Sequence, residues 1–208
     1  MAPARVPRIV QWLFPGYTWR IPTRERVLYL TFDDGPTPEV TPWVLDELAR
    51  AGAKATFFCI GRNCVTAGTI LQRIRAEGHV VGNHTWDHPR GRRTPMEDYL
   101  RNITRADALT SGTVFRPPYG SLTRQQARHI RRTHRIVLWD VLSGDYDPRI
   151  DGERCARRVI STARGGSIIV FHDSLKASAT LRKALPLVLA HFAGRGYRFE
   201  ALPFATEA

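Results

Sequence analysis

The sequence predicts an α/β fold in which parallel strands alternate with helices. Seven apolar, strand-like stretches recur along the 208 residues, and helical patterns fill the gaps between them. Such alternation implies parallel pairing through crossover connections, in a sheet or a barrel. Chemically active side chains follow several of these stretches, and in a β/α barrel the carboxyl ends of the strands carry the active site. We therefore expect a TIM-like barrel, as a single domain with a substantial core.

Residue type and spacing place the individual elements. The stretch 27–32 is rich in β-branched and aromatic residues, and Gly35 with the proline after it forces the chain out of the strand. Val40, Val44 and Leu48 follow at helical spacing and predict a helix that ends near residue 51. Further strands are expected near 55–59, 80–82, 113–115, 136–139, 167–171 and 197–201. Further helices are expected over 70–78 and 181–192.

The chain is strongly basic. Its formal charge is +12, from 31 basic and 19 acidic residues, and nearly all of the basic residues are arginine. Because the arginines are spread along the whole chain, we interpret them as solvated helix faces, with no nucleic acid as partner. An anionic polymer, a membrane surface or a nucleic acid is the less favoured reading, and a nucleic-acid binder would lose affinity steeply with salt.

The cysteines predict neither a disulfide framework nor a metal cluster. Cys59, Cys64 and Cys155 are an odd number in a chain of this length, so we expect reduced, buried thiols. Cys59 ends a strand-like stretch and packs as a small apolar side chain would. No Cys/His set stands beside Cys59 and Cys64, which disfavours a second metal site.

Two adjacent carboxylates stand at the end of the first predicted strand. Asp33 and Asp34 follow the apolar stretch directly and precede Gly35. They therefore lie at a strand's carboxyl end, where a barrel builds its site. An aspartate before glycine is also ordinary turn chemistry, so this pair alone does not decide between a turn and a site.

Two histidines supply the second half of a candidate metal site. His84 and His88 are spaced so that one turn of chain aims both imidazoles at a single cation. Catalytic zinc commonly takes three protein ligands, two His and one carboxylate among the usual sets, and leaves a position open for water. One aspartate of the earlier pair would complete the set. Alone, the two histidines would also suit a solvated polar loop, and their occurrence with the aspartates favours the metal site.

The later motifs carry a family resemblance. These motifs are Arg116-Pro117-Pro118-Tyr119-Gly120, Trp139-Asp140, Asp145-Tyr146 and the apolar run that ends in His172-Asp173. Together with the aspartates and histidines, in this order, the chain resembles the polysaccharide deacetylases, the carbohydrate esterase group (family 4) that shares the chitooligosaccharide deacetylase (NodB) homology domain. The resemblance implies a distorted (β/α)7 barrel, a metal-dependent hydrolase and an acetylated glycan as substrate. It also places the homology domain at 27–208 and an N-terminal extension that packs on it at 1–26.

The resemblance implies a role for each motif residue. It assigns Asp33 as the base, Asp34, His84 and His88 as metal ligands, Arg116 as the partner of the base, His172 as the acid, Asp145 as the carboxylate that orients the acid, and the Tyr119 amide as a donor to the oxyanion. Tyr146 and Val170 are expected to face the substrate. Zinc is the expected metal, and cobalt or nickel would suit the same ligands.

Physical chemistry gives the reason for each role. Amide hydrolysis needs an activated water, a stabiliser for the carbonyl oxygen and a proton for the departing amine. A divalent cation serves the first two needs, and Asp33 would take the proton of the water. Arg116 would hold Asp33 in place by charge-assisted hydrogen bonds. His172 must start protonated, and a carboxylate such as Asp145 stabilises that form.

Three positions depart from the pattern of the family. Tyr146 stands where the family usually has Trp, Leu142 where an additional Asp is common, and Val170 where Leu usually lines the acetyl pocket. None of these departures removes an acid, a base or a ligand. We expect them to change the shape of the acyl pocket and the choice of sugar, which the sequence does not identify.

The amino-terminal residues leave two questions open. The stretch Ile9–Pro15 is too short and interrupted for a membrane span, and no cleavage site of a signal peptide follows, so we expect a cytoplasmic protein, with export by another route or a trimmed leader as alternatives. Trp12, Phe14, Tyr17 and Trp19 would form either a sugar-stacking platform or, as we favour, a plug at the bottom of the barrel.

Two other functions suit the same residues. A protein that binds carbohydrate but has lost turnover would keep the fold, although the intact acid, base and ligands argue against it. An amidohydrolase of the same fold that acts on a small non-glycan amide would keep the chemistry, and a closed pocket would favour it over an open groove. The sequence leaves the oligomeric state and the choice between N- and O-acetyl groups undecided.

Overall fold

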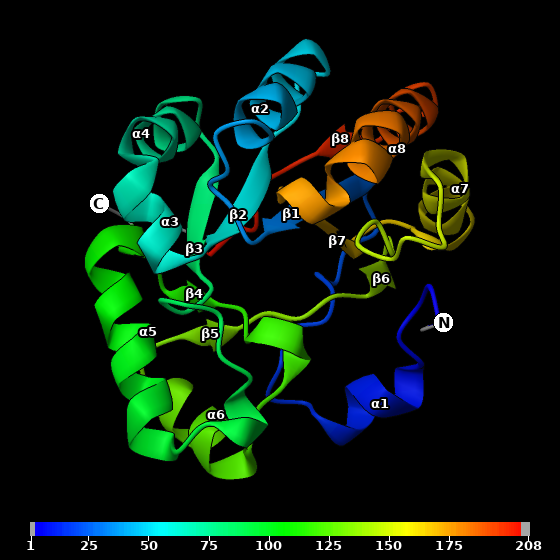
Figure 1. Cartoon of the computed structure of the whole chain (residues 1–208). Helices are drawn as coiled ribbons and strands as arrows, with labels where there is room; N and C mark the ends of the chain where they lie inside the picture. The colour runs from blue at the N-terminus through cyan, green and yellow to red at the C-terminus, as the bar shows by residue number, and fades with distance from the viewer. Residues whose placement is uncertain (1–2, 205–208) are drawn as a thin grey trace.

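Seven parallel strands lie side by side in the computed structural model, which describes residues 3–204 (Figure 1). Their order is β5-β4-β3-β2-β1-β7-β6, and β8 pairs with the start of β1. The strands are β1 (Val27–Asp33), β2 (Ala55–Cys59), β3 (Val80–Asn83), β4 (Val114–Phe115), β5 (Arg135–Ile136), β6 (Val141–Leu142), β7 (Ile168–His172) and β8 (Arg198–Phe199). The sheet curls into a distorted (β/α)7 barrel, so the predicted barrel is confirmed.

Helices surround the curled sheet (Figure 1). They are α1 (Arg8–Leu13), α2 (Thr41–Arg50), α3 (Gly61–Thr66), α4 (Gly68–Ala76), α5 (Met96–Thr110), α6 (Arg124–Ile130), α7 (Gly152–Thr162) and α8 (Leu175–Ala193), with short 3-10 turns η1 (Gly91–Arg93) and η2 (Pro118–Gly120). None of the helices in residues 3–204 combines the length and the apolarity that crossing a lipid bilayer requires.

The central strand β1 fixes the site, because it is buried along its whole length and hydrogen-bonded on both sides. Phe32 stacks on Phe57 of β2 and Phe171 of β7, with ring centroids 5.1 and 6.1 Å apart. Burial of each such side chain contributes about 1.5–3 kcal/mol to stability. The register places Asp33 directly opposite His172. Packing of the core thus sets two charged groups side by side at one edge of the sheet.

The amino-terminal segment bridges the two edge strands of the sheet, β5 and β6. Ala4 accepts a hydrogen bond from the amide of Leu142, at 2.8 Å. Thr18 donates to Ile136 and accepts from Leu138, both at 2.8 Å. The two ends of this segment therefore supply backbone partners at the gap in the barrel, and α1 lies between them.

Two expectations differ from the structure. The strand expected at 136–139 is the shorter strand β5, which ends at Ile136. A further strand, β6, was not expected, and it forms because Val141 pairs with Ile169 of β7. The aromatic plug is wrong for Trp12, whose side chain is 77% exposed. The outer limits of the expected extension and domain, residues 1–2 and 205–208, lie outside the described residues.

Candidate active site

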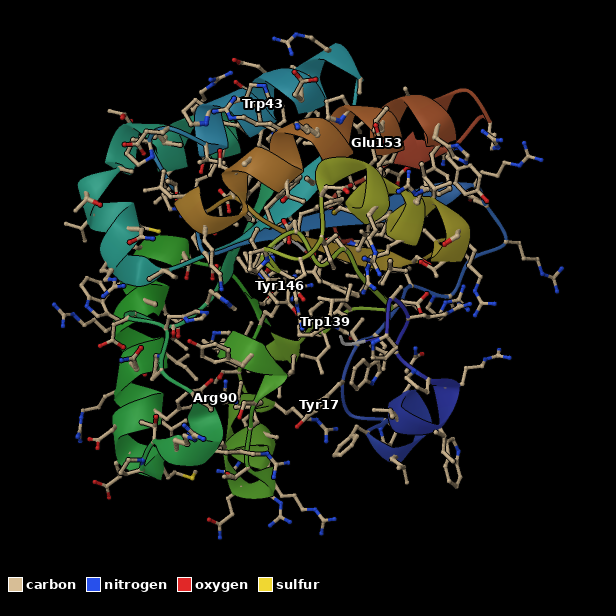
Figure 2. All side chains as sticks on the ribbon, turned by 45° about the vertical axis from the view of Figure 1, so that its right-hand side comes forward. Tyr17, Trp43, Arg90, Trp139, Tyr146 and Glu153 are labelled. Atoms are coloured by element: carbon tan, nitrogen blue, oxygen red, sulfur yellow. The ribbon has the colours of Figure 1, made fainter. Side chains whose placement is uncertain are left out.

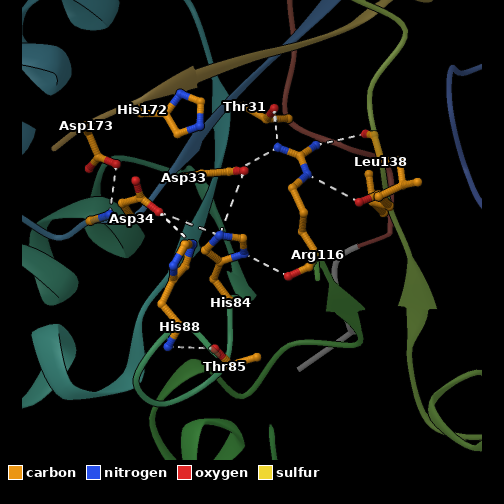
Figure 3. Close-up of polar contacts among 12 residues, drawn as sticks. Thr31, Asp33, Asp34, His84, Thr85, His88, Arg116, Leu138, His172 and Asp173 are labelled. Atoms are coloured by element: carbon orange, nitrogen blue, oxygen red, sulfur yellow. Dashed lines mark hydrogen bonds and ion pairs between the residues drawn. The ribbon is translucent and has the colours of Figure 1, made fainter. Parts of the chain in front are cut away.

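Three candidate metal ligands converge at the carboxyl ends of β1 and β3 (Figure 3). Asp34 Oδ1 lies 3.6 Å from His84 Nε2 and 3.3 Å from His88 Nε2, and the three ligating atoms lie within 4.8 Å of one another. Asp34 and His88 have φ values of 82° and 65°, a left-handed conformation that costs non-glycine residues about 1–3 kcal/mol. Strain of this kind concentrates at functional sites, and here it turns both side chains toward His84.

The polar atoms of this triad fit a divalent metal ion. Asp34 Oδ1 is buried and makes no hydrogen bond within residues 3–204, a costly state unless another group binds it. His84 Nδ1 lies 2.7 Å from the carbonyl oxygen of Arg116, and donation to that oxygen leaves Nε2 with its lone pair toward Asp34. Burial lowers the pKa of His84 to about 4, so its imidazole is neutral at pH 7.

The charge on Asp34 also suits a metal ligand. Burial raises the pKa of the Asp34 carboxyl, but the imidazoles of His88, His172 and His84 outweigh burial, and the net pKa lies well below its ordinary range. An ionised carboxylate beside a neutral imidazole is the protonation state in which such groups bind metals.

Asp33 is held by a fully buried arginine. Arg116 Nη1 donates to Asp33 Oδ1 and to Thr31 Oγ1, both at 2.7 Å (Figure 3). The remaining guanidinium donors reach the carbonyl oxygens of Val137 and Leu138, at 3.2 and 2.9 Å. Because every side of the guanidinium is engaged, it fixes the rotamer of Asp33 by a charge-assisted hydrogen bond. Removing one partner of a buried pair costs about 3–5 kcal/mol.

His172 is held from behind by Asp145. Asp145 Oδ1 lies 2.8 Å from His172 Nδ1, and Asp145 Oδ2 accepts the His172 backbone amide at 2.7 Å. Ser143 donates to the same carboxylate at 3.0 Å. Burial lowers the pKa of His172, but the charge and the hydrogen bond of Asp145 outweigh burial and raise it to about 9. His172 is therefore an imidazolium at pH 7, with Nε2 left for the cavity.

A cavity of about 470 Å³ opens over these groups. It is lined by Asp33, Asp34, His84, His88, Arg90, Tyr119, Trp139, Leu142, Tyr146, Val170, His172, Ser174 and Lys176. Arg116 and Asp145 do not line it and stand behind Asp33 and His172. All the residues that the sequence predicted at the site meet in this cavity or directly behind it.

The residues that the sequence predicted to face the substrate give the cavity mixed character. Tyr119, in η2, has a φ of 59°, and its ring lies edge-on to His88, with centroids 4.7 Å apart. The ring of Tyr146 lies edge-on to His172 at 5.1 Å. Buried Val170 and Leu142 add apolar wall. The cavity therefore offers apolar surface for a methyl group next to polar catalytic groups.

Two supporting residues were missed from the sequence. Asp173 is fully buried and accepts hydrogen bonds from the Gly35 amide at 3.0 Å and from Thr41 Oγ1 at 2.5 Å. Asn63 Nδ2 donates to the carbonyl oxygen of Asp34 at 2.8 Å. Together they hold the turn that presents Asp34. Asp173 follows His172 directly in a motif, so a signal existed, whereas nothing in the sequence marks Asn63.

Two cations stand at the rim of the cavity. The Arg90 guanidinium lies 4.2 Å from the centroid of the Tyr119 ring, and Lys176 Nζ lies 5.8 Å from that of Tyr146. Both side chains are exposed, and neither forms an ion pair with another described residue. Arg90 and Tyr146 come from different loops around the cavity (Figure 2). The rim thus offers two positive charges that no carboxylate within residues 3–204 neutralises.

Comparison with known proteins agrees with this geometry. A family model described as polysaccharide deacetylase matches residues 20–135. The chain is 34% identical over 183 residues to a peptidoglycan-N-acetylglucosamine deacetylase of Listeria monocytogenes. This match covers 85% of this chain and 38% of that longer protein. It is 34% identical over 208 residues to a chitooligosaccharide deacetylase of Azorhizobium caulinodans, covering 90% of this chain and 98% of that protein. A solved peptidoglycan N-acetylglucosamine deacetylase superposes with a TM-score of 0.88 at 29% identity, over 95% of each chain.

Proposed function

Since the chain belongs to the polysaccharide deacetylase family, we propose that it removes N-acetyl groups from an amino-sugar glycan by metal-assisted hydrolysis. The observation that carries the proposal is the Asp34, His84 and His88 triad with an oriented carboxylate and an imidazolium beside it. Acid, base and ligands are all present, which favours an enzyme over a binding protein without turnover.

Asp34, His84 and His88 would hold the metal ion. A bound divalent ion supplies a Lewis acid that polarises the acetyl carbonyl and lowers the pKa of water from about 16 toward 7. Two imidazoles and one carboxylate suit zinc best, and cobalt or nickel prefers similar donors.

Asp33 acts as the general base. Its Oδ1 is engaged by Arg116, so its other oxygen, Oδ2, is left for the attacking water. Oδ2 lies 4.0 Å from His84 Nε2, and therefore close to the metal site without being part of the triad. A base held in this way takes the proton at a fixed point, an effect worth about 10²–10⁴ in rate.

His172 acts as the general acid. Its pKa of about 9 keeps it protonated at neutral pH, and Asp145 fixes Nδ1 so that Nε2 gives its proton to the departing amine. The backbone amide of Tyr119 is proposed as a donor to the carbonyl oxygen, a contribution whose loss typically costs about 10²–10³ in rate. Val170, Leu142 and Tyr146 are proposed to surround the acetyl methyl group.

The two rim cations favour a glycan that carries carboxylates. Arg90 and Lys176 flank the cavity without acidic partners among the described residues, so a substrate anion would find them available. Of the glycans named for the relatives, peptidoglycan carries carboxylates on its muramyl residues and peptides, whereas chitooligosaccharides are neutral. We therefore place peptidoglycan ahead of chitin as the substrate. We also propose that the catalytic domain starts at Val27.

An acetate-release assay tests the proposal. Metal-loaded protein is incubated with peptidoglycan fragments, acetylated chitin oligomers and acetylated xylan, with Asp33→Asn as the control for contaminating activity. We expect acetate from peptidoglycan above all, and none from the variant. Turnover of a small amide such as allantoin or formamide, with silence across the glycans, would contradict the proposal and assign the site to small molecules.

A further inference from the structure

Helix α1 and the residue that follows it expose large apolar side chains to solvent. Ile9, Trp12 and Leu13 are 66%, 77% and 60% exposed, and Phe14, which follows the helix, is 38% exposed. None of the helical residues is buried. Contiguous exposed apolar surface of this kind is uncommon on soluble proteins and marks an interaction site. The four side chains Ile9, Trp12, Leu13 and Phe14 are called the apolar tip below.

The apolar tip is held in place by the backbone on both sides of it. Before α1, the Val6 amide donates to the Asp140 carbonyl at 3.0 Å, and within α1 the side chain of Gln11 donates through Nε2 to Asp140 Oδ1 at 3.2 Å. After α1, Thr18 pairs with Val137. The helix is therefore a fixed projection, and Figure 1 shows it at the periphery between α6 and α7.

Arginines surround this projection on two sides. On one side, the Arg131 guanidinium packs against Gly16, and Arg132 lines the same open hollow. On the other side, burial and then the charges of Arg5 and Arg20 lower the pKa of the Arg164 guanidinium, Asp140 opposes them, and Arg8 lowers the pKa slightly further. Four arginines therefore share the one carboxylate of Asp140 here, which leaves this side positive.

Acidic partners are scarce in this cluster. Asp140 pairs with Arg5, but Arg8, Arg131, Arg132 and Arg164 form no ion pair with any residue between 3 and 204. An apolar tip of Trp, Leu, Phe and Ile within a ring of arginine is the composition of elements that lie in the interface of a membrane.

We propose that the apolar tip, with Arg8, Arg131, Arg132 and Arg164 around it, docks the protein on an anionic lipid bilayer surface. The apolar side chains would enter the boundary between headgroups and acyl chains, and the guanidiniums would lie against lipid phosphates. Each arginine near an anionic surface strengthens binding about fivefold. A second copy of the chain suits this surface less well, because a two-fold contact would set the arginines against one another.

Docking of this kind also sets an orientation. The arginines at 131–132 and 164 lie in the turns that lead into β5 and β7, whereas the catalytic residues follow the strands. No residue of the apolar tip lines the catalytic cavity. A docked molecule therefore keeps its cavity free of the lipid.

Vesicle sedimentation tests the proposal, with phosphatidylcholine vesicles prepared with and without phosphatidylglycerol. We expect the full chain to sediment with the anionic vesicles only, and less of it as salt rises. Leu13→Glu should lower the partition coefficient at least about tenfold. Val65→Glu is the matched control, because Val65 on α3 is 61% exposed against 60% for Leu13 and the charge change is the same.

Two further measurements separate the proposal from its rivals. Arg131→Gln with Arg132→Gln should weaken binding about tenfold or more, and Arg50→Gln with Arg101→Gln, elsewhere on the surface, should not. Brominated lipid should quench tryptophan emission of the wild type and not of Trp12→Phe. Absence of binding, equal loss in Val65→Glu, quenching that survives Trp12→Phe, or Leu13-dependent dimers in light scattering without lipid would each overturn the proposal.

Discussion

The catalytic cavity and the region around α1 differ in how their charges are paired. At the carboxyl ends of the strands, Asp33 is hydrogen-bonded to Arg116 and Asp145 to His172, all at least half-buried. Around α1, Arg8, Arg131 and Arg132 are exposed and form no ion pair within residues 3–204. Partners packed into the core hold catalytic groups to one geometry, whereas unpaired charge at the surface is free to meet a ligand. The arginines that give the chain its net charge of +12 therefore have two different roles.

The same contrast appears in the backbone. Asp34, Thr85, His88 and Tyr119 adopt left-handed conformations around the cavity, and dense packing holds them there. The segment around α1 depends instead on a few backbone hydrogen bonds at its two ends. Substitutions at the cavity should therefore change chemistry or metal binding, and substitutions at the apolar tip should change neither.

The largest effect is expected from removing a ligand. His84→Ala or His88→Ala should abolish stoichiometric metal binding and reduce acetate release to background, because two remaining groups do not hold the ion. Elemental analysis of the purified variants measures the metal, and circular dichroism checks the fold. His129→Ala, on the exposed face of α6, serves as control. Stoichiometric zinc in either site variant would remove that histidine from the ligand set.

A second variant separates the base from the metal site. Asp33→Asn should keep the metal and lower kcat by about 10²–10⁴, because the amide has no proton-accepting oxyanion. Metal content and single-turnover rate are measured on one preparation. Retained deacetylation would show that Asp33 is not the general base, and the assignment of separate residues to metal binding and to proton transfer would be wrong.

The next largest effect is expected from the turn that supports Asp34. Asp173→Ala leaves the Gly35 amide and the Thr41 hydroxyl without their buried partner, so the free energy of unfolding should fall by about 2–4 kcal/mol. Metal affinity should fall about 10–100-fold, as for other residues that support ligands from behind. Denaturant unfolding and metal titration measure the two effects. Asp98→Ala, at an exposed ion pair on α5, is the control and should change neither, apart from at most about 1 kcal/mol in stability.

The pH profile tests the acid. As the proposed acid, His172 works only when protonated, so kcat should fall as pH rises through about 9. Asp145→Asn removes the charge and the hydrogen bond that raise this pKa most, so the pKa should fall toward its ordinary value of about 6.5. At pH 8 this shift should lower kcat about thirtyfold. An unchanged alkaline limb in Asp145→Asn would assign that limb to another group.

The smallest effect is expected at the rim. Arg90→Gln with Lys176→Gln should raise KM for peptidoglycan fragments about three- to tenfold, because exposed charge contacts are each worth at most about 1 kcal/mol. KM for chitin oligomers and kcat for both substrates should stay unchanged. Lys183→Gln with Arg101→Gln is the control, because it makes the same change in charge away from the cavity and should leave KM for both substrates unchanged. An equal rise for the neutral oligomer would argue against recognition of carboxylates.

Local sequence sufficed for those groups of the catalytic end that stand at the ends of long apolar strands. The two carboxylates at the end of β1 and the histidine that ends β7 could be placed without knowledge of the remaining fold. The two-residue strand β6 could not, since only pairing of Val141 with Ile169 makes it a strand. The exposure of α1 could not be predicted for a similar reason. It depends on backbone partners near residue 140, and the sequence pattern was equally typical of a buried plug.

The bridge between the edge strands also has a consequence for synthesis on the ribosome. Ala4 and Thr18 leave the exit tunnel first, yet their partners Leu142 and Ile136 follow more than a hundred residues later. Contacts so distant along the chain are slow to form. Segment 4–18 therefore lacks these backbone partners until residue 142 has emerged, and in that interval it is open to chaperones or to an early encounter with lipid.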